Sequence, residues 1–326
     1  MFLHKLHIAL FLLVFSGGQL LAQQVGNFSL LRENAYIQNP ALCGAKGFLN
    51  VTASFRKQFT SIAKSPYTIF LGAEGQLADK NVGIGGYIIN DQTGPTGQTG
   101  IGVSAAYQIR FNKHELVNEG EMHYNTSKRH MLTIGIGISV MQYRLNGNQL
   151  HPEDPNDPDL DKIRRVQYFP DATLGVYYQY REHFYAGFSV PQLLGLNVKY
   201  ALANGTSEIR RVQHLNFMVG GKIKFSREEQ YTIEPVAALR WEKNAPIQGD
   251  IGLRVTAFKS VWIGAMYRSV SQLVAEGGIA ILDYGRIAYA ADFELGSLKG
   301  QTGVSHEVAL ILNFKNKPKK TFRYLN

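Results

Sequence analysis

Apolar residues alternate with small or polar ones in short segments along residues 48–314, and most segments are separated by Gly, Asn, Asp or Pro. The segment Met131–Tyr143 shows the pattern best: one face would hold Leu132, Ile134, Ile136, Ile138 and Val140, and the other Thr133, Gly135, Gly137, Ser139 and Tyr143. A period of two residues is that of a β-strand with two different faces. Because only a closed sheet of strands satisfies every backbone N–H and C=O inside a bilayer, the pattern predicts a membrane β-barrel with its apolar face towards lipid.

The predicted fold class is all-β: an antiparallel, transmembrane outer-membrane β-barrel of about 14 strands. Each candidate strand is near the length that a tilted strand needs to cross a bilayer. An even number of strands places both chain ends on one side, which is the periplasmic side in bacterial barrels. The candidate strands are Phe48–Arg56, Pro66–Gln76, Asn81–Asn90, Gly100–Phe111, His130–Arg144, Asp171–Tyr180, Phe184–Val190, His214–Phe225, Tyr231–Trp241, Gln248–Phe258, Val261–Arg268, Gln272–Leu282, Arg286–Leu295 and Ser305–Phe314.

The connections between these strands alternate between short turns and longer loops, as in outer-membrane barrels. The long connections Leu145–Pro170 and Pro191–Gln213 fall on the side expected to be extracellular. Asn112–Arg129 breaks the rule, because it would be a long polar excursion on the periplasmic side. It is either a periplasmic contact element or a hairpin that the pattern does not reveal.

The two ends of the chain differ from the strand region. Lys5 precedes an apolar run that ends at Phe15, and Ala22 precedes Gln23, so residues 1–22 are predicted to be a cleaved signal peptide. Residues 23–47 are irregular, with a turn expected at Asn39-Pro40, and would lie in the periplasm or plug the barrel. Residues 315–326 form a basic tail. Both ends are candidates for periplasmic docking, and plain terminal disorder is the alternative.

Composition narrows the choice of partner. The formal net charge is +9 and the pI about 9.4, but the basic residues are scattered over strand ends and turns without an aromatic platform between them. This distribution favours basic rims against lipid headgroups and disfavours nucleic-acid binding. Mean hydropathy is −0.14 although 45% of residues are hydrophobic, as expected when apolar residues are spread through strands. A single cysteine excludes an internal disulfide.

Charges of both signs lie within the candidate strands, where they are tolerable only if they face water or one another. They are therefore assigned to the lumen, which would be either a polar channel or an interior filled by ion pairs; about fourteen strands allow both. The residues concerned are Arg56, Glu74, Arg110, Glu234, Arg240, Arg254, Arg268, Glu276, Asp292 and Glu294.

Candidate chemistry is sparse. Ser305 and His306 are residue types that hydrolases use as nucleophile and base. Adjacent strand residues point to opposite faces, however, so these two side chains cannot pair in that way. The acidic stretch His151–Asp161 lacks the glycine that lets a calcium loop turn, and its prolines stiffen it. The glycine pairs at 83/85 and 135/137 have no phosphate-binding context and instead indicate a close approach of neighbouring groups. We expect no catalytic residue, no cofactor and no metal site.

Several short motifs follow one another along the whole chain after the apolar leader. They are Asn39-Pro40-Ala41 with Gly44 and then Arg56 and Gln58; Pro66 and Thr68; Gly83, Gly85, Asn90, Asp91 and Gly94; Pro170-Asp171 with Gly175; Gly187 and Ser189; and Ser305-His306-Glu307. In order and spacing they resemble the PorP/SprF family of type IX secretion system outer-membrane proteins of Bacteroidota. The connection at 112–129 and the basic tail are longer than the family pattern.

The resemblance implies a non-enzymatic outer-membrane barrel that supports secretion or surface attachment of exported proteins such as adhesins, in some bacteria with gliding motility. Its implied partners are other components of the secretion system and the C-terminal sorting domain of a secreted adhesin, besides outer-membrane lipid. The motif residues would then be structural or partner-binding. A passive porin or small-solute channel with the same fold is the alternative.

Overall fold

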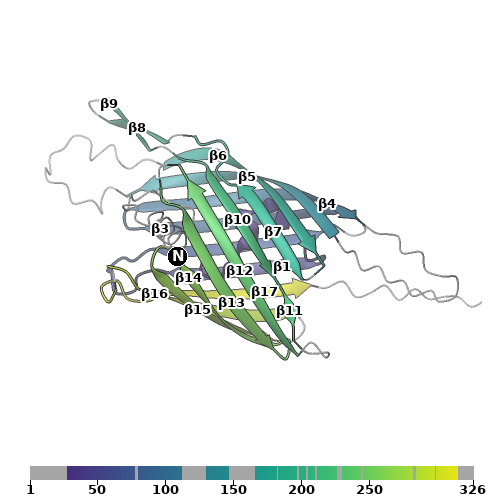
Figure 1. Ribbon diagram of the computed structural model, residues 1–326. Helices are drawn as coiled ribbons and strands as arrows, with labels where there is room; N and C mark the ends of the chain where they lie inside the picture. The colour runs from purple at the N-terminus through teal and green to yellow at the C-terminus, as the bar shows by residue number, and fades with distance from the viewer. Residues whose placement is uncertain are drawn as a thin grey trace, which may run out of the picture.

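A computed structural model gives the architecture of most of the chain. It describes residues 28–77, 80–111, 130–146, 166–181, 183–196, 198–202, 205–209, 211–225, 230–243, 245–281, 284–297 and 299–314. The predicted signal peptide, the connection 112–129, the acidic stretch 151–161 and the basic tail lie outside these residues. The described strands close into an antiparallel barrel (Figure 1).

Fourteen strands form the wall, because β10 and β11 pair with β12 in one continuous register and count as a single interrupted strand. The strands of the wall are β1 (Leu49–Lys57), β2 (Tyr67–Gln76), β3 (Val82–Thr93), β4 (Thr96–Phe111), β5 (His130–Leu145), β6 (Val166–Tyr180), β7 (Phe184–Val190), β10 (His214–Gly221), β11 (Ile223–Lys224), β12 (Tyr231–Glu242), β13 (Gln248–Ala257), β14 (Val261–Arg268), β15 (Gln272–Ile281), β16 (Gly285–Glu294) and β17 (Ser305–Phe314). The predicted fold class is confirmed, and the predicted strands all appear.

The barrel closes where the first strand meets the last. Leu49 of β1 pairs with Phe314 of β17, and β1 also pairs with β2. Both ends of the strand region therefore lie at the same end of the barrel, which we name the termini end. The other end is named the opposite end.

The two faces of the wall differ as the alternation predicted. In β5, Ile134, Ile136 and Ile138 point outwards and are 51%, 49% and 57% exposed, whereas Thr133, which precedes Ile134 and points inwards, is fully buried. The lumen assignment of the strand charges is also confirmed: Arg56 and Arg268 are 3% and 0% exposed. The outer face is thus a continuous apolar surface of the kind that hydrocarbon requires.

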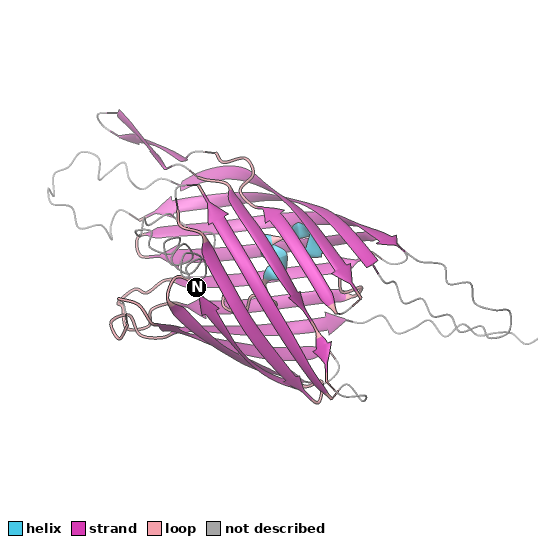
Figure 2. Ribbon diagram, in the orientation of Figure 1, coloured by secondary structure: helices cyan, strands magenta, loops and turns pink. Residues whose placement is uncertain are grey.

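The interior of the barrel is occupied by the chain that precedes β1. We name residues 28–47 the plug segment; it contains the short helices α2 (Ala35–Gln38) and η1 (Pro40–Leu42). Figure 2 shows these helices within the outline of the barrel, and η1 contacts β4, β5 and β6. No helix in the described part of the chain is long and apolar enough to cross a membrane.

Strand boundaries differ from the sequence prediction by several residues at two places, the start of β6 and the turn between β3 and β4. β6 begins at Val166, not Asp171, because Pro170 lies within the strand, exposed on the outer face and paired with Val140. β3 and β4 extend to a tight turn at Gly94, where φ is +55°, so residues predicted as a loop are paired. In both cases pairing continues where the apolar alternation has stopped.

A further hairpin was missed. The connection 191–213, predicted to be a loop, contains β8 (Val198–Leu202) and β9 (Gly205–Ile209), which pair only with each other. The Asn204-Gly205 dipeptide is a hairpin signal that the sequence does carry. The hairpin stands away from the barrel wall (Figure 1), so it shows no lipid-facing alternation.

The outward position of Ile136, near the middle of β5, gives a direct test of the membrane-facing surface. Replacing it by arginine places a charge against hydrocarbon and should lower the free energy of unfolding in lipid vesicles by about 2–4 kcal/mol. Denaturant titration of the folded barrel measures this change. Ile136→Leu should leave stability nearly unchanged, and equal stabilities of the two variants would contradict the assignment.

Candidate functional site

The plug segment runs through the lumen from near the opposite end to the termini end. Phe28 packs edge-on against Phe70, with ring centroids 5.7 Å apart, and its carbonyl accepts a bond of 2.6 Å from Arg268. At the other end of the segment, the backbone N–H of Gly44 donates to Glu74 at 2.8 Å, and Gln108 donates to the Gly44 carbonyl at 2.8 Å. The segment is therefore held by the wall along its length.

A first polar cluster fixes the beginning of the plug segment. The N–H of Ser29 donates to Glu307 at 2.5 Å, and the side-chain amide of Asn34 donates to the same carboxylate at 2.7 Å. Arg56 pairs with Asp292 at 2.7 Å and with Glu307 at 3.5 Å, and it also donates to the Ser29 hydroxyl. Because buried carboxylates need donors, the plug segment completes a charge arrangement that the wall alone would leave unsatisfied.

A second polar cluster surrounds Glu33 of the plug segment. Arg254 holds this carboxylate with two bonds of 2.9 and 3.1 Å and also donates to Glu276 at 2.9 Å. Arg32 pairs with Glu276 at 3.0 Å, so cations and anions of plug and wall alternate. Burial alone would raise the pKa of Glu33, but Arg254, with Arg286 and Arg32, lowers that pKa to about 2. The carboxylate is therefore ionised at neutral pH, and removing one partner of such a buried pair costs about 3–5 kcal/mol.

Asn39 joins the plug segment to the wall at β6 and β7. Its side-chain N–H group donates to the carbonyls of Val176 and Phe188, at 3.2 and 3.4 Å. Its side-chain oxygen accepts the N–H of Ala41 at 3.0 Å and caps η1, in which Pro40 occupies the first turn. Asn39 thus caps η1 and binds two strands. It does so because its amide group offers both N–H donors and a carbonyl acceptor.

Lumen-facing glycines make room for this contact. A Cβ at Gly175 would overlap the side-chain oxygen of Asn39, one at Gly135 would overlap the backbone at Pro40 and Ala41, and one at Gly83 would overlap the carbonyl of Cys43. The wall therefore approaches the plug segment more closely than any side chain permits.

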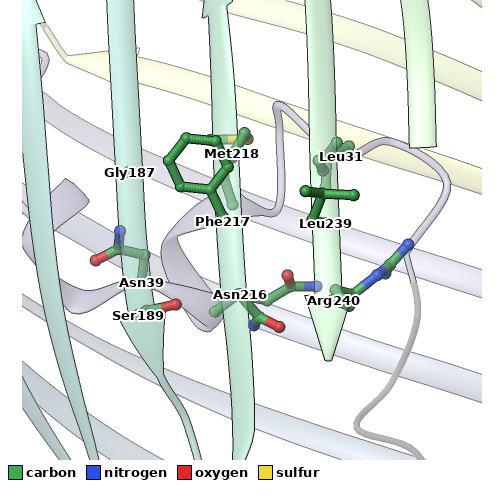
Figure 3. Close-up of a pocket in the computed structure, with 12 residues that line it drawn as sticks. Leu31, Asn39, Gly187, Ser189, Asn216, Phe217, Met218, Leu239 and Arg240 are labelled. Atoms are coloured by element: carbon green, nitrogen blue, oxygen red, sulfur yellow. The ribbon is translucent and has the colours of Figure 1, made fainter. Parts of the chain in front are cut away.

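A small cavity of about 30 Å³ remains between the plug segment and β7, β10 and β12 (Figure 3). Asn39, Ser189, Asn216 and Arg240 are among the residues that line it. A cavity of this size can hold water, and the lining offers several polar partners. The interior is thus packed nearly to the limit along this side.

A larger pocket of about 300 Å³ lies at the termini end, between the plug segment and β6, β7 and β12. Two ion pairs lie at its edge, Lys46 with Glu74 at 3.6 Å and Lys222 with Glu234 at 3.8 Å. The lysine side chains are 38% and 36% exposed, so the cations face the pocket and the Glu74 carboxylate, at 2%, lies behind. The lining of this pocket is therefore mixed, with apolar and aromatic side chains as well as the charged groups at its edge.

The structure brings about half of the family-like motif residues together at the plug segment. These are Asn39, Pro40, Ala41 and Gly44 within it, and Arg56, Gly83, Gly85, Gly175, Gly187, Ser189 and Glu307 around it. Gly85 faces the hydroxyl of Tyr36, and Gly187 faces the amide of Asn39. Residues separated by most of the chain thus form one contact surface.

The remaining motif residues lie elsewhere. At the opposite end, Gln58 bonds to the carbonyl of Pro66, Thr68 donates to Asp91 at 2.5 Å, and Asp171 pairs with Arg211 at 2.9 Å. Asn90, Gly94, Pro170 and Ser305 also belong to this end of the wall. His306 lies on the outer face, where its ring nitrogen bonds to the hydroxyl of Tyr289 at 2.6 Å.

No arrangement for catalysis or metal binding was found among the described residues. Ser305 and Glu307 are buried in the lumen and His306 faces outwards, as strand alternation requires, so the three side chains do not form a triad. In that same part of the chain, no group of three or more His, Cys, Asp or Glu could hold a metal ion.

The sequence analysis missed the plug residues that carry the charge pairs. Ser29, Arg32, Glu33 and Asn34 lie in an irregular segment without periodicity, so nothing local distinguished them. The usable signal was indirect: charged residues at lumen positions of the strands need partners, and Arg32-Glu33 is a pair of opposite charges in the segment most able to supply them.

A family model described as "Type IX secretion system membrane protein PorP/SprF" matches residues 20–312. None of the curated proteins compared with the sequence matches it.

Several solved structures are similar in fold at low sequence identity. The CymD monoaromatic hydrocarbon channel is 9% identical, with 92% of this chain and 96% of that chain covered and a TM-score of 0.48. The Pseudomonas putida toluene transporter TodX is 9% identical, with 90% and 99% covered and a TM-score of 0.44. The KdgM porin is 8% identical, with 82% and 99% covered and a TM-score of 0.36.

The single cysteine reports on docking of the plug segment, because Cys43 is free and 0% exposed, and burial raises the pKa of its thiol. Gly175→Ala should push Asn39 away from the wall; overpacking of this kind costs about 1–3 kcal/mol. Labelling of Cys43 by a maleimide in the folded barrel should therefore accelerate by roughly tenfold or more. Gly86→Ala is the matched control, since its Cβ would meet only the Gly102 carbonyl at 3.5 Å. Equal labelling of both variants and the wild type would show that the glycines do not hold the plug segment.

The pKa of Glu33 predicts how docking depends on pH. Because this pKa is lowered from 4.5 to about 2, the charge pair stabilises the docked state fully above 4.5 and less and less as the pH falls from 4.5 towards 2. Hydrogen exchange of the plug segment should show a constant difference between wild type and Glu33→Gln from neutral pH down to about 4.5, shrinking below it. A difference that disappears close to neutral pH would refute the assigned pairing with Arg254.

Proposed function

Because this chain belongs to the PorP/SprF family of type IX secretion system membrane proteins, we propose that it supports secretion or surface attachment of exported proteins through protein–protein contacts in the outer membrane. The observation that carries this proposal beyond the family is the filled lumen. The plug segment occupies the interior with buried contacts from Phe28 to Gly44. A barrel built in this way presents surfaces to partners and does not leave a wide passage.

The alternative function, a passive porin or small-solute channel, receives less support. In porins of sixteen or more strands the lumen is an aqueous channel, whereas narrower barrels can be filled by their own side chains. Here the lumen charges are used in pairs between wall and plug segment, such as Arg254 with Glu33 and Arg56 with Asp292. Paired, buried charges fill a space and do not line a water path.

The proposed orientation places the termini end in the periplasm. It is supported by the even number of strands, by the predicted signal peptide at residues 1–22 and by the position of the long connections 145–170 and 191–213 at the opposite end, whereas 112–129 is the one long connection at the termini end. The basic tail 315–326 and the 300 Å³ pocket would then be available to periplasmic components of the secretion system. The β8–β9 hairpin would stand outside the cell, where a sorting domain of a secreted adhesin could bind.

No catalytic step is proposed. The family resemblance implies gliding or adhesion in Bacteroidota, and the chain would act there as a scaffold. The motif residues at the plug segment would then be structural, since they hold the interior together, and partner binding would fall to the loops and ends of the barrel.

The proposal is tested by affinity purification of the tagged, full-length barrel from detergent-solubilised envelopes, followed by mass spectrometry. Other type IX secretion components, or a secreted protein with a C-terminal sorting domain, should be enriched over a control purification of an unrelated barrel tagged in the same way. Deletion of the gene should remove an exported protein from the cell surface, and the wild-type gene and Gly86→Ala should both restore it.

Normal export in the deletion strain, together with purification of the barrel free of secretion components, would refute a role in secretion. A requirement for the barrel in uptake of a small solute would then favour the channel.

A further inference from the structure

A hollow of about 670 Å³ indents the outer wall of the barrel at β7, β10, β11, β12, β13 and β14, and its lining is almost wholly apolar. Figure 1 shows β7, β10, β12 and β13 side by side on the wall nearest the viewer. The exposed side chains at its edges are large, such as Phe184, Ile223 and Ile251, which are 42%, 52% and 66% exposed. The hollow is therefore an indentation in the surface that faces lipid.

Strand register explains why the wall is indented here. Gly221 pairs with Phe184, and Leu253 pairs with both Pro235 and Ala265. From β7 to β14, adjacent outward positions thus vary between large and small side chains. They are Phe184, Gly221, Pro235, Leu253 and Ala265. Side chains of Phe184 and Leu253 rise on either side of a floor that glycine, proline and alanine cannot fill.

The proline in the floor also interrupts the sheet. Pro235 has no N–H to give to the ladder, and the pairing of β10 and β11 with β12 stops at Lys222 although the register is unchanged on both sides. In this register Gly221 lies opposite Pro235 and loses the bond that an N–H there would give, whereas the N–H of Lys222 points to the other neighbour and bonds to the carbonyl of His183 at 3.0 Å. The hollow is therefore built into the backbone of these strands and does not depend on one rotamer.

The hollow reaches the edge of the wall at the termini end. His183, in the turn between β6 and β7, lines it, and Arg181 belongs to the same turn. The guanidinium of Arg181 lies 5.9 Å from the ring centroid of Tyr180, and the residue has a φ of +52°. The apolar hollow thus ends at a turn that carries a permanent cation, and arginine is well suited to bind a phosphate group.

We propose that the hollow binds one acyl chain of a phospholipid from the leaflet at the termini end, with the lipid phosphate against Arg181 and His183. Hydrocarbon is the solvent on this face, and a flexible chain can fill a curved trough with many weak contacts. A second protein would need about 1,000 Å² of complementary surface. The edge residues would resist such a contact, because they project around a concave floor.

The test uses native mass spectrometry of the purified full-length barrel titrated with dipalmitoyl phosphatidylglycerol. Ala237→Phe and Ala265→Phe fill the floor of the hollow with a ring and should each weaken binding roughly tenfold, the change that about 1.4 kcal/mol produces. Arg181→Gln should weaken binding of phosphatidylglycerol while leaving the hollow intact. Lipid that remains bound after mild purification from cells should be a phospholipid by mass.

Ala53→Phe and Ala105→Phe are matched controls, because both alanines lie on the outer face of strands away from the hollow. They should bind lipid as the wild type does, and heat-dependent mobility on gels checks that every variant is folded. Equal lipid binding by the hollow and control variants would overturn the proposal. Recovery of lipopolysaccharide in place of phospholipid would overturn the assigned leaflet and with it the proposed occupant.

Discussion

Hydrocarbon offers no partner for a hydrogen bond, and this constraint determines the rest of the structure. Within the bilayer each strand must bond to two neighbours, so the sheet closes where Leu49 meets Phe314. The outer face must then be largely apolar, and charged strand residues within the bilayer must face inwards. The alternation in β5, with isoleucines outside and Thr133 and glycines inside, is the direct result.

Charged side chains that face the lumen need partners there, and the plug segment supplies them. Arg56, Arg254 and Asp292 are almost completely buried in the lumen, where an unpaired charge would be costly. Ser29, Glu33 and Asn34 supply the missing donors and acceptors from a part of the chain that is not in the wall. The wall and the plug segment are therefore mutually dependent, and this dependence is the physical reason to regard the barrel as a scaffold for contacts.

Sequence reasoning predicted the wall well and the interior poorly, for one physical reason. A strand between lipid and lumen repeats every two residues, so its position, its faces and the opposite orientations of His306 and Glu307 follow from local pattern. The plug segment has no period, and Glu33 meets its partner Arg254 at a separation of 221 residues. The lumen glycines at 83 and 135 did indicate a close approach, but not what approaches. The β8–β9 hairpin was missed because its pairing lies beyond the alternating segments.

The plug segment fills the lumen and is held there by buried charge pairs. Single-channel recording of the purified wild-type barrel in planar bilayers tests this most directly, with a variant lacking residues 28–47 as the open reference. We expect no sustained conductance steps from the wild type and clear ohmic steps from the shortened chain. Steady conductance of the wild type, equal to that of the shortened chain, would contradict a filled interior.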